Sequence, residues 1–345
     1  MEINMKNITK VGLSALAGSL AFTSVQAGDM SISGSMITSY TKKGGYSTTG
    51  NPLGMSKALT VTGSGELDNG VSVAYKQTIT DAMGYNDSEL VFTGVPMLGD
   101  ATIAMTSAGS PLSAIDDLTP IAFEEANASV GSIDDVNGAD GDYGIRYTLA
   151  DVAGTGVTLD AMYVPKLGSG DAPAEKGVSG NGANAGNEDA YEVVLKGAVP
   201  GVEGLTFAVG GAQLNKSATE TVAASDLDQQ EGTVNLNYAI GSLKVGAQKS
   251  VVDVQGTAEN IFRTDYVGVS YAISDNLSVS YNWIESDKHR QGQGAETVSQ
   301  EFDSISLSYT AGGMTIGILD ADVDNATYTS AREQSARAIQ MTVAF

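Results

Sequence analysis

The sequence predicts an all-β protein, a transmembrane antiparallel up-and-down β-barrel of sixteen strands with short turns at one end and long loops at the other. Three observations lead to this prediction. Apolar and polar residues alternate in many short segments, which is typical of strands with one apolar and one polar face. The connections between these segments alternate between short and long. The chain also begins with an export signal and contains no cysteine.

Residues 1–27 have the organisation of a secretory signal peptide. Lys6 and Lys10 form a positive region, residues 11–22 are mostly apolar, and small residues precede a cleavage point after Ala27. This apolar run is shorter than the roughly 20 residues that a spanning helix needs. We therefore expect a cleaved signal followed by a single barrel domain, residues 28–345. An N-terminal anchoring helix is the alternative, and the segment lengths favour it less.

The first half of the predicted barrel begins with strands at residues 29–40 and 56–67. Each later strand is predicted from apolar residues at every second position, which would face outward. For strands two to eight these positions are Leu59 and Val61; Val71, Val73, Tyr75 and Ile79; Leu90 and Phe92; Ala101, Ile103 and Met105; Tyr143, Ile145, Tyr147 and Leu149; Val157, Leu159 and Tyr163; and Tyr191, Val193 and Leu195.

The second half continues the same alternation to the last residue of the sequence. Strands nine to sixteen show Leu205, Phe207 and Val209; Val234, Leu236 and Tyr238; Leu243, Val245 and Ala247; Val267, Val269 and Tyr271; Leu277, Val279, Tyr281 and Trp283; Ile305, Leu307 and Tyr309; Ile316 and Ile318; and Ile339, Met341, Val343 and Phe345. Several tyrosines lie near predicted strand ends, where an aromatic ring can sit at a membrane–water boundary. This placement favours a barrel in lipid over a soluble β-sandwich, which would also alternate.

The connections provide the second argument for a barrel. The long ones are predicted near residues 41–55, 81–87, 107–140, 165–188, 214–229, 251–262, 286–300 and 321–334. The short ones between them are rich in glycine, asparagine and aspartate, which favour tight turns. Short turns at one end and long loops at the other are typical of transmembrane barrels.

Several segments resemble one known family. The signal ends in residues 25–28 (VQAG), residues 63–70 read GSGELDNG, the third long loop is the longest connection, and the chain ends in Phe345. This pattern resembles the sixteen-stranded general diffusion porins of the Gram-negative outer membrane, in particular those of alphaproteobacteria. The resemblance implies a homotrimer, a third loop folded into the pore, passage of small hydrophilic solutes, and a terminal Phe345 read by the barrel assembly machinery.

The third loop, predicted at residues 107–140, holds the main candidate site. Loops of this length are usually functional or disordered. This loop combines an apolar cluster with carboxylates, and a loop lying against the barrel wall explains both. The candidate pore-constriction acids are Asp116, Asp117, Glu124, Glu125, Asp134 and Asp135. Rings of charged side chains at a constriction set ion preference.

Basic residues are expected on the wall opposite the third loop, as the resemblance implies. The alternation places four of them inward, namely Lys76, Arg146, Lys196 and Lys244. This set is sparser and richer in lysine than the arginine cluster usual in such porins. Because acids outnumber bases, with a formal net charge of −23, we expect a channel that prefers cations and no nucleic-acid partner.

The sequence offers no catalytic constellation, so we expect no enzyme activity. The single histidine, His289, lies in a polar segment predicted as a loop, without a nucleophile motif nearby. The glycine-rich segment 168–186 is not followed by the lysine of a phosphate-binding loop. No cofactor is expected, although Asp320, Asp322 and Asp324 form a possible weak Ca²⁺ site. Since Ca²⁺ needs 6–8 oxygen ligands, solvated turns are the favoured interpretation, and bound divalent ions could bridge to lipopolysaccharide.

Three other functions are compatible with parts of this pattern. An outer-membrane surface, adhesion or receptor barrel without significant conductance is the main alternative, and it would place the third loop outside the barrel. A soluble secreted β-sandwich is disfavoured by the apolar strand ending in Phe345, because exposed strand edges aggregate. A gated active transporter is disfavoured because no plug domain is expected ahead of the first strand.

Overall fold

The computed structural model describes residues 30–80, 85–96, 98–168, 187–216, 228–254, 260–290 and 297–345. The predicted signal peptide, residues 1–27, lies outside these described residues. So do residues 169–186 and 217–227, which form most of two predicted long loops.

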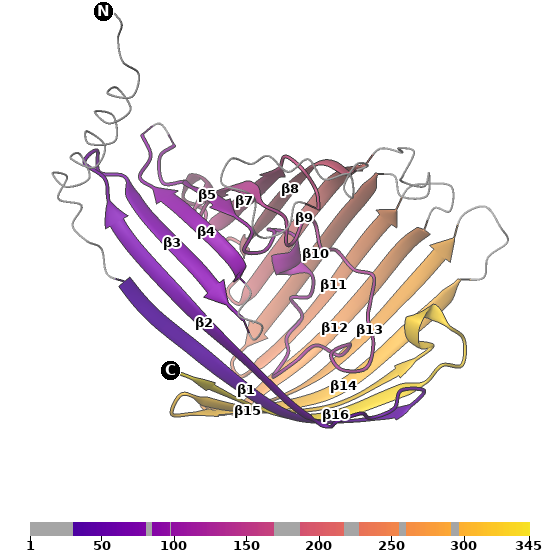
Figure 1. The fold of residues 1–345 in the computed structure, drawn as a ribbon. Coiled ribbons are helices and arrows are strands. Elements are labelled where there is room, and N and C mark those ends of the chain that lie inside the picture. The colour runs from indigo at the N-terminus through magenta and orange to yellow at the C-terminus, as the bar shows by residue number, and fades with distance from the viewer. Residues whose placement is uncertain are drawn as a thin grey trace, which may run out of the picture.

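Sixteen antiparallel strands form one closed barrel, which confirms the predicted fold class. Each strand pairs with its neighbours in sequence, and β1 pairs with β16 to close the wall (Figure 1). The strands are β1 (Met30–Gly45), β2 (Leu53–Glu66), β3 (Ser72–Ile79), β4 (Tyr85–Thr93), β5 (Thr102–Thr106), β6 (Gly144–Leu149), β7 (Val157–Val164), β8 (Asn187–Ala198), β9 (Leu205–Lys216), β10 (Gln229–Ile240), β11 (Leu243–Val254), β12 (Asn260–Ser274), β13 (Leu277–Arg290), β14 (Val298–Ala311), β15 (Met314–Asp324) and β16 (Gln334–Ala344). Closure leaves no strand edge unpaired.

Short 3₁₀ turns are the helical elements of the described chain: η1 (Ser113–Ile115), η2 (Val152–Gly154) and η4 (Ala326–Tyr328). Within the described ranges, no helix combines the length and the hydropathy needed to cross a membrane.

The closing contact between β1 and the chain end involves Phe345. Its backbone N–H donates to the Gly34 oxygen at 2.9 Å, and the Gly34 N–H donates to the Phe345 oxygen at 2.8 Å. The aromatic ring lies over Gly34, where an added Cβ would be 2.6 Å from the ring, and the residue is 73% exposed. Phe345 therefore presents an aromatic ring on the outer surface at the short-turn end of the barrel.

The strand pairing gives the wall two chemically different faces. Residues paired across the ladder share a face, so Tyr281, Val269 and Ile305 lie on the same side, and all three are exposed. Their neighbours Asn282 and Ser304 are buried on the other side, beneath the third loop. The outer face is therefore apolar and the inner face mainly polar along the middle of these strands.

Several strands are longer at the long-loop end than the sequence pattern predicted. The loops predicted at residues 251–262, 286–300 and 321–334 begin inside β11, β13 and β15, and His289 lies in β13 rather than in a loop. The pattern failed here because, near the long-loop end, charged residues lie on the outer face of the wall and apolar residues lie on the inner face. Charged residues such as Glu301 point outward while Phe302 is buried inside. The strands stay paired through their backbones in this region, although their outward-facing residues are no longer apolar.

The buried core lies between the inner wall and the third loop, which comprises residues 107–143 between β5 and β6. In Figure 1 this loop runs across strands β10 to β13. One apolar cluster joins Leu112, Ile115 and Val136 of the loop to wall residues that include Val194 and Phe262. A second cluster joins loop residues to the wall on β12 to β16. Its buried members are Ala126, Val130, Tyr266, Ile284, Phe302, Leu319, Ala321, Val323, Ala326, Ala336 and Ala338.

Candidate functional site

Two glutamates on the inner wall hold the base of the third loop. Glu192 on β8 accepts hydrogen bonds from the Leu112 N–H at 3.1 Å and from the Ala139 N–H at 2.6 Å, one on each carboxylate oxygen. Glu231 on β10 accepts from the N–H groups of Asn137 and Gly138, both at 2.7 Å and both on Oε2. Hydrogen bonds to ionised acceptors are stronger than neutral ones. The two carboxylates therefore bind both ends of the loop to the wall.

Amide side chains of the wall continue this attachment along the middle of the loop. Gln248 on β11 accepts from the Leu118 N–H at 2.9 Å and donates to the Ile115 oxygen at 2.8 Å. Asn237 on β10 donates to the Leu118 oxygen at 2.8 Å, and Asn282 on β13 donates to the Pro120 oxygen at 3.2 Å. The wall thus satisfies backbone groups of the loop much as a neighbouring strand would.

The far part of the loop reaches the last strands of the barrel. The Ala122 N–H donates to Ser280 Oγ at 2.9 Å, and the Phe123 N–H donates to Ser306 Oγ at 3.2 Å. Further along, the Asp134 N–H donates to the Tyr328 hydroxyl of η4 at 3.3 Å. The contacts from β8 to β14 therefore extend over seven of the sixteen strands of the wall.

Glycines on the inner face give the loop room to approach the wall. An added Cβ at Gly268 would lie 2.8 Å from Thr119 Cβ and 2.9 Å from Pro120 N. At Gly317 an added Cβ would collide with the ring of Phe123. These glycines are needed for close approach rather than for an unusual backbone conformation.

Replacing Gly268 with valine is expected to push the third loop away from the wall. Overpacking of this kind costs typically about 1–3 kcal/mol, and here the loop is the part able to move. Protease protection of the loop in the refolded barrel measures the effect. Gly63→Val is the matched control, because a Cβ at Gly63 meets nothing within 4 Å. Equal protection of both variants would show that the loop does not lie on Gly268.

The structure brings together four of the six predicted acids. Asp116, Asp117, Glu125 and Asp135 line one cavity of about 230 Å³ between the loop and the wall. Glu124 and Asp134 belong to the same loop but do not line this cavity. Among the described residues, none of the six acids forms an ion pair with lysine or arginine.

Burial changes the acidity of these carboxyl groups. Desolvation, followed by repulsion from Asp117, Asp116 and Glu124, raises the pKa of Glu125 to about 7. Desolvation raises the pKa of Asp135 to about 8, although hydrogen bonds from Val136 and Ser250 oppose the shift. The pKa values of Asp116, Asp117 and Glu124 are also raised, in each case mainly by burial. Near neutral pH the cluster is therefore partly protonated.

The strand pairing places all four predicted bases on the inner face. Lys76, Arg146, Lys196 and Lys244 each align with residues whose side chains face the barrel interior. Arg146 is not a free cation, because its guanidinium donates from Nε to Asp160 Oδ1 at 2.8 Å and from Nη2 to the second oxygen. Sequence reasoning missed Asp160, which faces inward on the adjacent strand β7.

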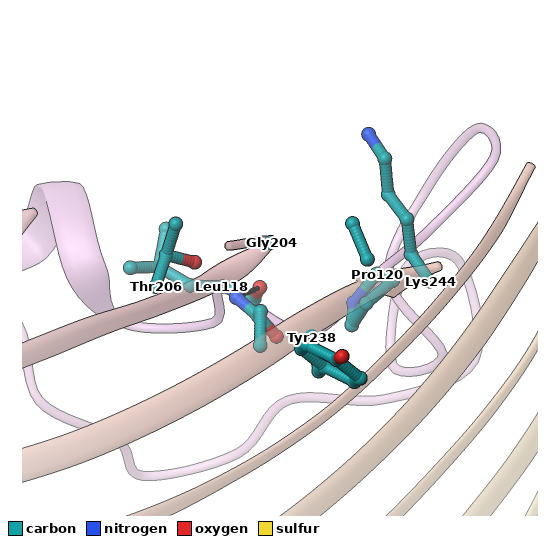
Figure 2. A pocket seen from close by; sticks show the side chains of 8 residues that line it. Leu118, Pro120, Gly204, Thr206, Tyr238 and Lys244 are labelled. Carbon is teal, nitrogen blue, oxygen red and sulfur yellow. Dashed lines mark hydrogen bonds between the residues drawn. The ribbon is translucent and has the colours of Figure 1, made fainter. Parts of the chain in front are cut away.

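Lys244 lies beside the point where the loop approaches the short-turn end. It lines a cavity of about 300 Å³ with Leu118 and Pro120 of the loop and with Thr206 and Tyr238 of the wall. Figure 2 shows the amine of Lys244 extending past Pro120, away from Tyr238. Lys244 is thus the predicted base that lies against the third loop itself.

The three aspartates considered as a weak Ca²⁺ site lie on the outer face of β15. Asp320 forms an ion pair with Arg337 on β16 at 3.0 Å, and Asp322 and Asp324 are exposed at alternate positions beyond it. Nowhere in the described ranges do three or more carboxylate, histidine or cysteine side chains form a group able to hold a metal ion. Because all three aspartates lie in β15, they are strand residues and not the turn residues that the sequence favoured.

The wall residues that hold the loop were not singled out from the sequence. Glu192 and Glu231 carry a usable signal, because the alternation on β8 and β10 already places them inward. Gln248 carries no such signal, since an inward glutamine is ordinary in a polar lumen. Which loop atoms these residues contact depends on the path of the loop, which local sequence does not determine.

A closed sixteen-stranded barrel with a long loop held against its inner wall defines the fold of the Gram-negative outer-membrane porins. The chain has this fold, as the resemblance predicted. It is similar to OmpT, an outer membrane protein of Vibrio cholerae, with 12% identity, a TM-score of 0.65, and coverage of 92% of this chain and 98% of that one. It is also similar to the anion-selective porin of Comamonas acidovorans, with 14% identity, a TM-score of 0.65, and coverage of 92% and 99%.

A third similar structure is OmpF of Salmonella typhi in complex with daunomycin, with 10% identity, a TM-score of 0.60, and coverage of 92% of this chain and 98% of that one. No protein-family profile matches the sequence, and no curated protein matches it. At these identities the similarity establishes the fold.

Proposed function

We propose that the chain forms a passive channel of the bacterial outer membrane, through which small hydrophilic solutes and ions diffuse. The observation that carries the proposal is the polar inner wall of a closed barrel, with an acidic loop bound along it. Outer-membrane barrels with an apolar outer band and a polar interior commonly hold a water-filled channel. Known porins among the similar structures support this assignment. No enzyme activity is proposed.

The charges around the third loop favour a channel that prefers cations. Six loop acids lack a basic ion-pair partner among the described residues, whereas Arg146 is neutralised by Asp160. The remaining predicted bases, Lys76, Lys196 and Lys244, are lysines spread over three strands. A passing ion therefore meets more fixed negative than positive charge. The anion-selective porin of Comamonas acidovorans has the same fold, so we assign ion preference from side chains and not from the fold.

We propose a homotrimer as the assembly, with outer-membrane lipid and lipopolysaccharide around it. One structure of Vibrio cholerae OmpT is described as a trimer form, which supports the proposal. The exposed ring of Phe345 next to Gly34 is proposed as the signal for the barrel assembly machinery, since a terminal aromatic would sit at the membrane interface.

Single-channel recording tests the proposed function. Refolded mature chain in a planar bilayer under a KCl gradient is expected to give stepwise conductance in threes and a reversal potential on the cation side. If a correctly folded barrel gave no conductance, the channel function would be excluded, and a surface-receptor barrel would be the function that remains.

The cation preference is expected to fall as the pH is lowered from 9 to 6. The pKa of Asp135 is raised to about 8 and that of Glu125 to about 7. Both groups are ionised above these values and become neutral as the pH falls through them, so negative charge leaves the lumen. Reversal potentials in KCl with a chelator measure the change. Glu125→Gln/Asp135→Asn should show a much flatter profile, and an unchanged wild-type potential across this range would contradict the prediction.

A further inference from the structure

The connection between β15 and β16, residues 325–333, packs into the mouth of the barrel, and we call it the last loop. Ala326 of η4 is fully buried and belongs to one of the two apolar clusters on the inner wall. The ring of Tyr328 packs against the ring of Phe262 on β12, with 5.5 Å between the two centroids. The Lys288 amine on β13 lies 5.5 Å from the centroid of Tyr328, which is a cation–π contact. The last loop is therefore anchored on the inner wall.

Backbone strain is concentrated in the last loop. Four of its non-glycine residues have a left-handed φ, namely Asn325 (55°), Thr327 (57°), Tyr328 (53°) and Ala331 (60°). Residues persist in this sparsely populated conformation only where the surrounding structure holds them. One such contact comes from the wall, because the Asn325 side-chain amide donates to the Ser299 oxygen of β14 at 3.0 Å. A loop held in this way changes shape when a few contacts are lost.

One buried side chain of the wall joins the last loop to the third loop. Gln300 on β14 is fully buried. Its Oε1 accepts a hydrogen bond from the Thr327 N–H of the last loop at 2.6 Å, and its Nε2 donates to the Ser132 oxygen of the third loop at 3.4 Å. Buried polar groups are almost always hydrogen-bonded, so moving either loop leaves one end of this amide without its partner. Gln300 therefore favours the arrangement in which both loops are docked.

Tyr328 makes the second connection between the two loops. Its hydroxyl accepts a hydrogen bond from the Asp134 N–H at 3.3 Å and also hydrogen-bonds to Ser286 Oγ on β13 at 2.9 Å. In the part of the chain that the structure describes, Tyr328 and Gln300 supply the hydrogen bonds between residues 130–134 of the third loop and the rest of the barrel. Residues 130–134 therefore depend on the last loop for their polar contacts.

The other side of the last loop is exposed at the long-loop end of the barrel. The guanidinium of Arg332 lies 4.0 Å from the centroid of the Tyr46 ring, in the loop between β1 and β2. Tyr46 is exposed, and its N–H donates to the Glu333 oxygen at 2.8 Å. The last loop therefore connects this exposed surface with the third loop inside the barrel.

We propose that the last loop is a latch on the third loop, and that Tyr328 and Gln300 are positioning residues of the proposed channel. With the latch closed, the Asp134 backbone is held in place through its own N–H. With the latch open, residues 130–134 lose their hydrogen bonds and leave the wall, while the base of the third loop stays bound to β8 and β10. The last loop therefore sets the position of one acidic segment of the pore independently of the base.

Thiol labelling tests the latch, because the chain contains no cysteine of its own. Val130→Cys places one thiol at a position 2% exposed in the latched segment, and Ile115→Cys places one at a fully buried position nearer the base. In the refolded full barrel, Tyr328→Ala should raise the labelling rate at position 130 about tenfold or more through local opening, and change that at position 115 less than about twofold. Thr329→Ala, an exposed change in the same loop, is the matched control and should change neither rate.

Two milder variants test the individual hydrogen bonds. Tyr328→Phe keeps the ring against Phe262 and loses only the hydroxyl, so it should raise the labelling rate of Val130→Cys about threefold or more. Gln300→Met is similar in size and removes both amide contacts, so it should act in the same direction. Equal rates in wild type and Tyr328→Ala, or an equal rise at both reporter positions, would overturn the latch.

Single-channel recording connects the latch to the proposed function, and only this part of the inference rests on that function. Tyr328→Ala should give a wider and noisier channel than wild type, whereas Thr329→Ala should not. Labelling that depends on Tyr328 in a barrel without conductance would overturn the channel alone. A conducting barrel in which Val130→Cys is labelled equally with Tyr328 and with Tyr328→Ala would overturn the latch alone.

Discussion

Replacing Glu192 and Glu231 together with alanine is expected to release the third loop from the barrel wall. Their carboxylates accept four backbone N–H groups, from Leu112, Ala139, Asn137 and Gly138. Hydrogen bonds to charged groups contribute about 1.5–3 kcal/mol each, and leaving a buried donor without a partner costs about 1–3 kcal/mol. Even with incomplete additivity, the docked loop loses several kcal/mol, while the strand pairing of the barrel stays intact.

The released loop should become open to a glutamate-specific protease, which can cut after Glu124 or Glu125, and the proposed channel should become wider and noisier. Glu203→Ala, on an exposed short turn, is the control and should stay protected. A double variant as resistant as wild type would show that the two carboxylates do not hold the loop.

The glutamine variants of the same residues refine this prediction. Glu231 uses one oxygen, Oε2, for both loop donors, so Glu231→Gln keeps the necessary acceptor and should protect the loop well. Glu192 uses both oxygens, one for each donor. An amide there presents an NH₂ group to one N–H, so Glu192→Gln should be clearly more sensitive to protease.

Neutralising the acidic loop is expected to move the reversal potential towards anions. The variant Asp116→Asn/Asp117→Asn/Glu124→Gln/Glu125→Gln removes four carboxylates from the third loop. A unit charge about 4 Å from an ion contributes about 1 kcal/mol in water-like surroundings, a factor of about five in preference. Since not every group lies that close to the ion path, we expect the cation-to-anion permeability ratio to fall severalfold to about tenfold.

The local structure of the loop should survive these changes. Asp117 accepts hydrogen bonds from the N–H and hydroxyl of Thr119 through one oxygen, and Asp116 accepts from the Asp117 N–H. Asparagine retains an oxygen for each of these bonds. The substitutions therefore remove the charges without breaking the turn, so a change in reversal potential reports the loss of charge.

A variant with the same number of neutralised acids on the other side of the wall is the control. Glu301, Asp303, Asp322 and Asp324 lie on the outer face of β14 and β15. Glu301→Gln/Asp303→Asn/Asp322→Asn/Asp324→Asn should leave the reversal potential close to that of wild type. A quadruple loop variant without any shift would place the loop acids away from the ion path.

The strand alternation was sufficient to predict the barrel, because each wall strand separates two different solvents. Leu277, Val279 and Tyr281 face outward and their serine and asparagine neighbours face inward, so the period of two is written directly in the sequence. The same reasoning failed at the long-loop ends. There the inward-facing residues Phe302 and Val323 are apolar because a loop covers them. The local sequence does not show which face of a strand will be covered.

The candidate site was predictable in kind but not in arrangement. The combination of apolar residues and carboxylates in residues 107–140 indicated a loop that packs against another part of the protein, and the six candidate acids lie within that one segment. It did not indicate that Asp135 and Glu125 share a cavity with Tyr266, a residue far away in sequence on β12. Nor did it show that Arg146 would be neutralised by Asp160 across one strand pair.

The sequence by itself determined the number of strands and, along the middle of the strands, which residues face each side, because lipid and water impose a period of two there. The tertiary structure alone decided where the third loop lies, which wall residues hold it, and which carboxylates come together. The physical reason is that these contacts join residues far apart in the chain, such as Leu118 with Gln248 and Ala122 with Ser280. Their energies depend on distances that only barrel closure establishes.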